Sequence, residues 1–190
     1  MERSYAALRQ KLRAGDFAPG TRLEAQRLAD DIGVSMTPIR DALHQLAGER
    51  MVEATLGEGF RVPRLNEAEV RELYEWYSAI LSMALRTTPT VAQAPATRLQ
   101  SSGGTLADRA AELFSRLAAA VPNRELREAI LATDARIHPF RIHEERVIEA
   151  TDDELAEIAR VDPAQPQAFR RYHLRRMRAA PDLLRAREAS

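Results

Sequence analysis

The chain contains no cysteine among its 190 residues, which excludes disulfide bonds, thiolate metal ligands and cysteine nucleophiles. Any metal site must therefore be built from histidine and carboxylate side chains. The chain also lacks the run of roughly 18 apolar residues that a membrane helix needs, and its N-terminus is polar and charged, unlike a secretory signal. We expect a cytoplasmic protein with no membrane partner.

An excess of positive charge is absent as well. The chain has 28 Lys and Arg against 28 Asp and Glu, and residues 1–65 hold ten basic against nine acidic side chains. The whole molecule thus carries no basic signature of nucleic-acid binding. DNA binding stays compatible with this balance, because phosphate contacts depend on where charge lies on one face.

We expect two domains, because the chain is longer than one typical domain of about 100 to 150 residues. The first covers residues 1–64. Three amphipathic helices are predicted: residues 3–14, a segment carrying Leu23, Leu28 and Ile32 that ends at Gly33, and a segment capped by Ser35 or Thr37 that runs to Gly48. Short β-prone pieces follow at 51–55 and 60–62, joined across two glycines. This order is that of a winged helix-turn-helix.

The second domain, residues 65–190, is predicted to be an all-α bundle, so the fold class is mainly α. Asn66 and Glu69 form a capping box that starts its first helix. Further helices are predicted at 105–121, 123–149, 151–161 and 166–179. Pro139 should kink or interrupt the second of these. Residues 87–104 are rich in Pro, Ser and Gly and are predicted to be a flexible connection.

Two short helices separated by a tight glycine turn allow the second helix to project its first turn into the major groove. In that turn Ser35 and Thr37 offer hydroxyls that suit phosphates, and Arg40 suits a guanine edge or a phosphate. The alternative is a capped surface helix with a solvated arginine.

The first domain resembles the GntR family of bacterial regulators. The matching segments are Pro19 to Leu23, Leu28 to Ser35, Thr37 to Leu43, Leu46, and Gly59 to Val62. The resemblance implies that Arg22, Ser35, Thr37 and Arg40 contact DNA phosphates and bases, that the wing tip from Gly57 to Gly59 enters the minor groove, and that Arg27 adds a phosphate contact. Met36, in the predicted DNA surface, and Glu58, at the wing, stand where family members carry basic or polar residues, which should weaken affinity and change base preference.

The block from Leu65 to Glu75 is similar to the start of the helical FCD domain of the FadR-like GntR subfamily. That resemblance implies a homodimer, one divalent metal ion of the Zn, Mn or Ni class, and a small organic acid as effector. The implied metal ligands are Asp134 and His138, four residues apart on one helix, and His173. The third family histidine has no counterpart, and residues 149–155 offer only acidic or small groups. The alternative is a hydrogen-bonded Asp134–His138 pair with His173 as a surface residue.

The usual carboxylate-binding arginine of the subfamily is absent from the first helix of this domain. Arg136 and Arg141 are candidates to replace it, and Arg141 is the predicted ligand-binding residue; the alternative is a solvated or ion-paired surface arginine. A cluster of five arginines between residues 170 and 178 touches DNA, forms a solvated helix face, or balances the acidic helix from Asp152 to Glu157.

These patterns predict a non-catalytic, ligand-responsive transcription regulator, by family habit a repressor, that binds an inverted-repeat operator in double-stranded DNA as a homodimer. One rival is a metal-dependent enzyme of the helical domain, which would use Asp134, His138 and His173. Another is a sensor or dimerisation protein whose winged helix has lost operator binding, motivated by Met36, Glu58 and the neutral net charge.

Overall fold

The computed structural model describes residues 2–87, 104–160 and 167–189. Its contacts divide the chain into two compact units, which meet between Leu65 and Asn66, one residue from the predicted boundary. The predicted connection at 87–104 lies outside the described residues except for its two end positions. In the described part of the chain, no helix combines the length and apolar character required to cross a membrane.

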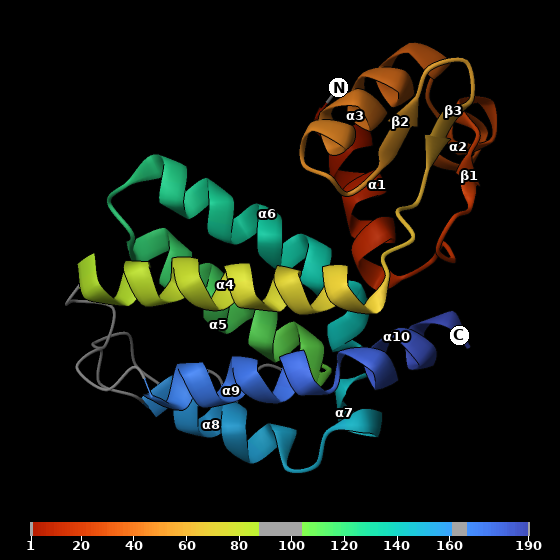
Figure 1. Cartoon of the computed structure of the whole chain (residues 1–190). Helices are drawn as coiled ribbons and strands as arrows, with labels where there is room; N and C mark the ends of the chain where they lie inside the picture. The colour runs from red at the N-terminus through yellow and green to blue at the C-terminus, as the bar shows by residue number, and fades with distance from the viewer. Residues whose placement is uncertain (1, 88–103, 161–166, 190) are drawn as a thin grey trace. The chain divides into compact units, whose positions relative to one another are not determined.

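The first unit contains three helices and a small antiparallel sheet (Figure 1). Its elements are α1 (Glu2–Ala14), β1 (Arg22–Leu23), α2 (Ala25–Ile32), α3 (Met36–Gly48), β2 (Glu53–Thr55) and β3 (Gly59–Arg61). Helix α3 packs against both α1 and α2, and Ile39, Leu43 and Leu46 are fully buried in the core. The predicted winged-helix order is confirmed.

The structure corrects the prediction for Leu23, which was expected to open the second helix. Leu23 instead lies in β1 and pairs with Phe60 of β3, while Arg22 pairs with Arg61. The sheet therefore has three strands in the order β1-β3-β2 rather than two. A two-residue strand has too little sequence for a period-2 pattern, and its pairing with a distant strand determines its conformation.

The second unit is helical throughout its described residues. Its elements are α4 (Glu67–Thr87), α5 (Leu106–Ala120), α6 (Arg124–Arg141), α7 (Glu144–Val147), α8 (Thr151–Arg160), α9 (Gln167–Arg178) and α10 (Ala180–Glu188). Helix α4 lies between α6 and α9 and contacts α10 as well (Figure 1). Helix α5 packs against α6 and α8.

Capping explains where α4 begins. The Asn66 side chain accepts a hydrogen bond from the Glu69 amide at 3.0 Å, and the Glu69 carboxylate accepts one from the Asn66 amide at 2.7 Å. This confirms the predicted capping box. Thr105 and Asp108 make a second box at the start of α5.

Two predicted boundaries differ from the structure. The single helix expected over 123–149 ends at Arg141, two residues after Pro139, and the chain continues as the short α7. A proline cannot donate the backbone hydrogen bond of a helix interior, so Pro139 sits in the last turn. Helix α10 was not predicted, although Pro181 stands in its first turn, where proline is favoured.

Candidate nucleic-acid interface and helical core

The turn between α2 and α3 depends on Gly33. Its φ is 74°, in the left-handed region, and its amide donates to the Ala29 carbonyl at 2.9 Å. Val34 donates to the same carbonyl at 3.0 Å. Glycine enters this conformation without a steric penalty, so the chain reverses within a few residues and α3 starts at once.

The first turn of α3 presents the predicted DNA-reading residues on one exposed surface. Ser35 occupies the N-cap position in an extended conformation, and its side chain makes no capping hydrogen bond. Ser35, Thr37 and Arg40 are exposed, and Met36 is 37% exposed. The opposite face of α3 is fully buried. The helix is therefore fixed by its apolar side while its polar first turn faces outward.

Arg22 and Arg27 come together around a pocket of about 310 Å³ formed by the loop after α1, by β1 and by α2. Three carboxylates, those of Asp16, Glu24 and Asp31, line the same pocket. Two arginines at one place suit phosphate binding, but the acidic groups offset their charge.

The wing is the hairpin between β2 and β3. Gly57 and Gly59 both have positive φ values, 79° and 87°. Glu58 is exposed at the tip, and the neighbouring Leu56 is 102% exposed. The structure thus presents an acidic and an apolar side chain where a DNA-binding wing commonly carries cations.

The helical unit has a polar cluster in its core, around Asp134 of α6. The Tyr77 hydroxyl of α4 donates to Asp134 Oδ1 at 3.0 Å, and Arg141 Nη1 donates to the same oxygen at 2.9 Å. Arg141 is 2% exposed, and its guanidinium lies 5.2 Å from the centroid of the Phe114 ring. Burial and the Asp134 carboxylate raise the pKa of Tyr77 well above its usual value. Arg141 is therefore paired with a carboxylate, but it is buried and not the surface arginine of the alternative interpretation.

His173 of α9 is completely buried, so its expected alternative as a surface residue is wrong. Its ring packs edge-on against Tyr77 and Tyr172. Nδ1 lies 2.7 Å from the Phe169 carbonyl, which makes Nδ1 the protonated nitrogen and leaves Nε2 as an acceptor. Burial lowers the pKa of His173 to about 3, and Nε2 has no hydrogen-bond partner within the described part of the chain.

The predicted metal ligands do not form a three-residue cluster. Within residues 2–87, 104–160 and 167–189, no group of three or more His, Asp or Glu side chains is arranged to hold a metal ion. His138 Nε2 lies 4.0 Å from Asp108, and the Asp134 carboxylate is engaged by Arg141. The guanidinium of Arg141 thus supplies the positive charge beside the Asp134 carboxylate. Metal binding stays a prediction from the sequence.

Two acidic residues of the 149–155 segment, where the family's third histidine has no counterpart, are paired with arginines. Asp152 pairs with Arg109 at 2.7 Å, and Glu154 pairs with two arginines of α9. Neither carboxylate joins Asp134.

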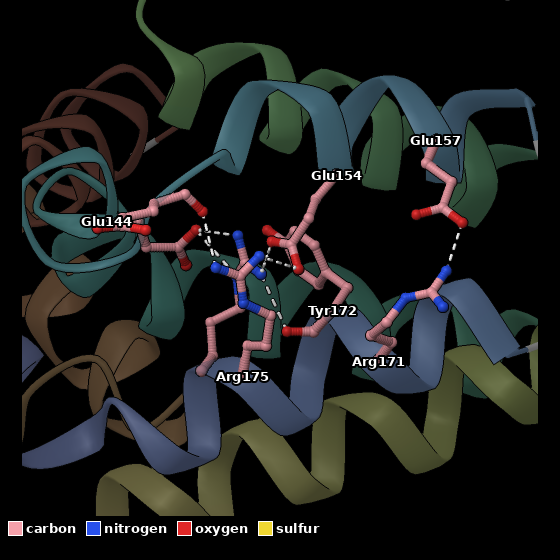
Figure 2. Close-up of polar contacts among 8 residues, drawn as sticks. Glu144, Glu154, Glu157, Arg171, Tyr172 and Arg175 are labelled. Atoms are coloured by element: carbon pink, nitrogen blue, oxygen red, sulfur yellow. Dashed lines mark hydrogen bonds and ion pairs between the residues drawn. The ribbon is translucent and has the colours of Figure 1, made fainter.

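Arg176 joins three helices through a buried network, and its partners Glu144, Glu154 and Tyr172 are labelled in Figure 2. Its guanidinium donates to Glu144 Oε2 of α7 at 3.0 and 2.9 Å, to Glu154 Oε2 of α8 at 2.6 Å, and to the Tyr172 carbonyl at 3.0 Å. Tyr74 of α4 donates to the other oxygen of Glu144 at 3.1 Å. Burial works to lower the pKa of Arg176, but Tyr172 and Glu144 outweigh it, so the pKa is raised.

Sequence analysis missed Arg176 and Glu144 as core residues. The spacing of Phe169, His173 and Arg176 places all three on one helical face, which is the signal that could have identified the buried arginine.

Two more arginines of α9 pair with the acidic helix α8, as one of the sequence alternatives expected. Arg171 pairs with Glu157, and Arg175 pairs with Glu154 at 2.8 Å (Figure 2). Arg171, Arg175 and Arg176 are thus engaged in ion pairs inside their own unit.

Comparison with known proteins gives one family match and several relatives. Residues 1–62 match the model described as "Bacterial regulatory proteins, gntR family". The chain is 34% identical over 71 residues to an uncharacterized HTH-type transcriptional regulator, YdhC, of Bacillus subtilis (37% of this chain, 32% of that protein). It is 32% identical over 66 residues to the HTH-type transcriptional regulator McbR of Escherichia coli (35% and 30%). The alignments thus cover about a third of these relatives' length.

Solved structures extend the likeness in fold over nearly the whole chain. A putative GntR transcriptional regulator from Rhodococcus sp. RHA1 has a TM-score of 0.61 at 17% identity, covering 100% of this chain and 97% of that one. McbR/YncC of E. coli has a TM-score of 0.57 at 18% identity, covering 96% and 92%. At these identities the similarity concerns the fold alone.

Proposed function

We propose that this chain is a DNA-binding transcription regulator, because its residues 1–62 match the model of the gntR family of bacterial regulatory proteins. The observation that carries the proposal is the first turn of α3, whose polar side chains are exposed while the rest of the helix is anchored in a buried core. A helix held in this way can enter the major groove and bring Arg40 to a base edge.

In this proposal Arg40 reads bases, and Ser35 and Thr37 contact phosphates or bases beside it. Arg22 and Arg27 bind the DNA backbone next to α3, since they lie together at β1 and α2. Met36 supplies an apolar contact, such as that to a thymine methyl group. The wing from Gly57 to Gly59 approaches the minor groove.

The regulator acts as a homodimer on an inverted repeat and represses transcription. This finer assignment is supported by the helical second unit, whose fold is shared with GntR-type structures over nearly their whole length. A homodimer presents two copies of α3, and their twofold symmetry matches a palindromic site.

The helical unit binds a small organic acid as effector. Arg141 Nε and His173 Nε2 are buried without hydrogen-bond partners among the described residues, and both side chains lie close to Phe114. Arg141 offers a donor and the neutral His173 an acceptor. A carboxylate can accept a hydrogen bond from the arginine, and a hydroxyl can donate one to the histidine. Binding shifts the population of states that differ in DNA affinity.

Selection of bound sequences from a random duplex pool tests the regulator proposal. The wild-type chain is expected to enrich a palindrome, and Arg40→Ala is expected to lose the enrichment. Arg3→Ala is the matched control, because Arg3 is an exposed arginine of α1 in the same unit. A folded protein that enriches no sequence at low salt would refute the proposal.

A protein that has lost operator binding is the second candidate, favoured by exposed Glu58 and Met36. The salt dependence of DNA affinity separates the two candidates. An operator-binding dimer with several phosphate contacts loses affinity steeply as salt rises, whereas a flat and weak response supports the second candidate.

A further inference from the structure

One face of α4 is exposed from residue 72 to residue 86, and its side chains are arranged so that two copies of the face could complement each other. Residues 72, 76, 79, 83 and 86 follow the spacing i, i+4, i+7, i+11 and i+14, which places them in one line on a helix. They read Glu72, Trp76, Ala79, Met83 and Arg86, and all five are exposed. The opposite face of α4 is buried against α6, α9 and α10. The line is thus an unpartnered helix face within the described residues of the helical unit.

The exposed residues are unusual for a solvent-facing helix surface. Trp76 is 52% exposed and Met83 is 48% exposed, and Ala79 lies between them. Trp76 is the single tryptophan of the chain. Tryptophan and methionine are enriched at the centres of protein interfaces, where their loss costs most.

The charges at the two ends of the line identify the occupant. Glu72 lies seven residues before Ala79, and Arg86 lies seven residues after it. If two α4 helices cross antiparallel at Ala79, Glu72 lies opposite Arg86 of the partner subunit, and the reverse pair forms at the other end. Trp76 then lies beside Met83 of the partner subunit, a favourable sulfur–aromatic contact. A twofold interface requires this kind of self-complementarity.

We propose that two copies of the chain associate through this face of α4, antiparallel about Ala79, with the Trp76 and Met83 side chains at the centre and two Glu72–Arg86 pairs at the rim. The inference rests on the homodimer of the proposed function and names its surface. The small Ala79 side chain permits close approach where the helix axes cross.

The test measures the dimer dissociation constant of the full chain by sedimentation velocity and, in the proteins that keep Trp76, also by its fluorescence on dilution. Trp76→Glu and Met83→Glu are each expected to raise the constant at least about 30-fold, because each introduces two charges at the centre of the interface. Circular dichroism and thermal melting establish that each variant is folded. Both positions are half exposed, so neither substitution leaves a cavity in the core.

The rim pairs test the antiparallel register. Glu72→Arg or Arg86→Glu alone places like charges opposite each other twice and is expected to weaken the dimer about tenfold. The double variant Glu72→Arg/Arg86→Glu restores opposite charges and is expected to recover the wild-type constant. Arg170→Glu, at an exposed position of α9, is the matched control and leaves the constant unchanged.

A wild-type chain that stays monomeric, folded variants with the wild-type constant, or a double variant that does not recover would each overturn this inference. Sequence selection on DNA with the same proteins keeps the two proposals separate. A wild-type dimer that enriches no sequence contradicts the regulator proposal alone, whereas dimeric Trp76→Glu that still enriches the wild-type palindrome contradicts the α4 interface alone.

Discussion

At the scale of single residues, the buried arginine Arg176 is the group on which most of the polar core depends. It contacts Glu144, Glu154 and the Tyr172 carbonyl, and it is fully buried. Its guanidinium also stacks on the Tyr172 ring, 3.3 Å from the centroid. Two buried carboxylates have their charge balanced by this cation, so its removal leaves both without full compensation.

We predict that Arg176→Met destabilises the helical unit by about 3 to 5 kcal/mol, the cost of breaking a buried ion pair by removing one partner. Arg171→Met is the control on the same helix, because Arg171 is 58% exposed and pairs with Glu157 at the surface. That control is expected to cost less than about 1 kcal/mol. Urea unfolding followed by Trp76 fluorescence and circular dichroism measures both values, and equal effects would contradict the buried network.

The low pKa of buried His173 makes the stability of the folded chain depend on pH. Burial lowers its pKa to about 3 in the folded chain, below the usual value of 6.5, so the unfolded chain takes up the proton first as pH falls. The stability that neutral His173 permits is complete above about pH 6.5 and is lost progressively down to about pH 3.

Between pH 7.5 and pH 5, wild-type protein in a chelating buffer should therefore lose about 2 kcal/mol more stability than His173→Phe. The phenylalanine ring fills the same aromatic surroundings without a titrating group. Unfolding at both pH values measures the difference, which cancels the other titrating groups. Parallel losses in the two proteins would show that His173 is protonated in the folded state.

The residue types of this core were only partly predictable from the sequence. Asp134, Arg141 and His173 were all predicted as site residues. The prediction rested on the resemblance to the FCD domain and on the helical spacing of Asp134 and His138. Their pairing was not predictable, since the Asp134–Arg141 bond and the tight packing of His173 depend on how α4, α6 and α9 meet.

At the scale of elements, the glycine turn between α2 and α3 determines where the recognition helix begins. Gly33 has a φ of 74°, a conformation that other residues adopt at a cost. Space does not limit a side chain here, because a Cβ atom at Gly33 would meet nothing within 4 Å. Backbone strain is thus the whole expected effect of a substitution.

Gly33→Ala is expected to destabilise the first unit by about 1 to 2 kcal/mol. Gly48→Ala is the matched control, because Gly48 lies in α3, and a Cβ atom there also meets nothing within 4 Å. An alanine in a helix is as stable as glycine or more so, so the control should keep or gain stability. Amide hydrogen exchange of α2 and α3 reports on this unit, and similar exchange in both variants would contradict the assigned role of Gly33.

Elements with strong local signals were predicted, and elements defined by distant contacts were not. The capping box at Asn66 and the apolar stripe after it located α4, and Gly33 and Pro38 located α3. Strand β1 depends on pairing with β3, which lies far along the chain. Helix α10 follows α9 almost without a break, so no turn signal separated the two in the sequence.

At the scale of the whole molecule, positive and negative side chains balance each other within each unit, and neither unit is strongly basic. The formal net charge is zero, and three arginines of α9 pair with carboxylates of α8 inside the same unit. The cations proposed to meet DNA are few, and acidic groups surround Arg22 and Arg27. The proposed affinity for DNA therefore comes from α3 and from two copies of the chain acting together, rather than from a broad basic surface.

The capping box at the start of α4 has a consequence for how such a chain can evolve. Asn66 and Glu69 satisfy each other's backbone amides, and both residues belong to the helical unit, whose boundary lies at Asn66. The first turn of α4 therefore borrows no cap from the preceding sequence. Recombination at this junction can join the helical unit to a different N-terminal domain and leave the cap of α4 intact. The two units can therefore be exchanged independently in evolution.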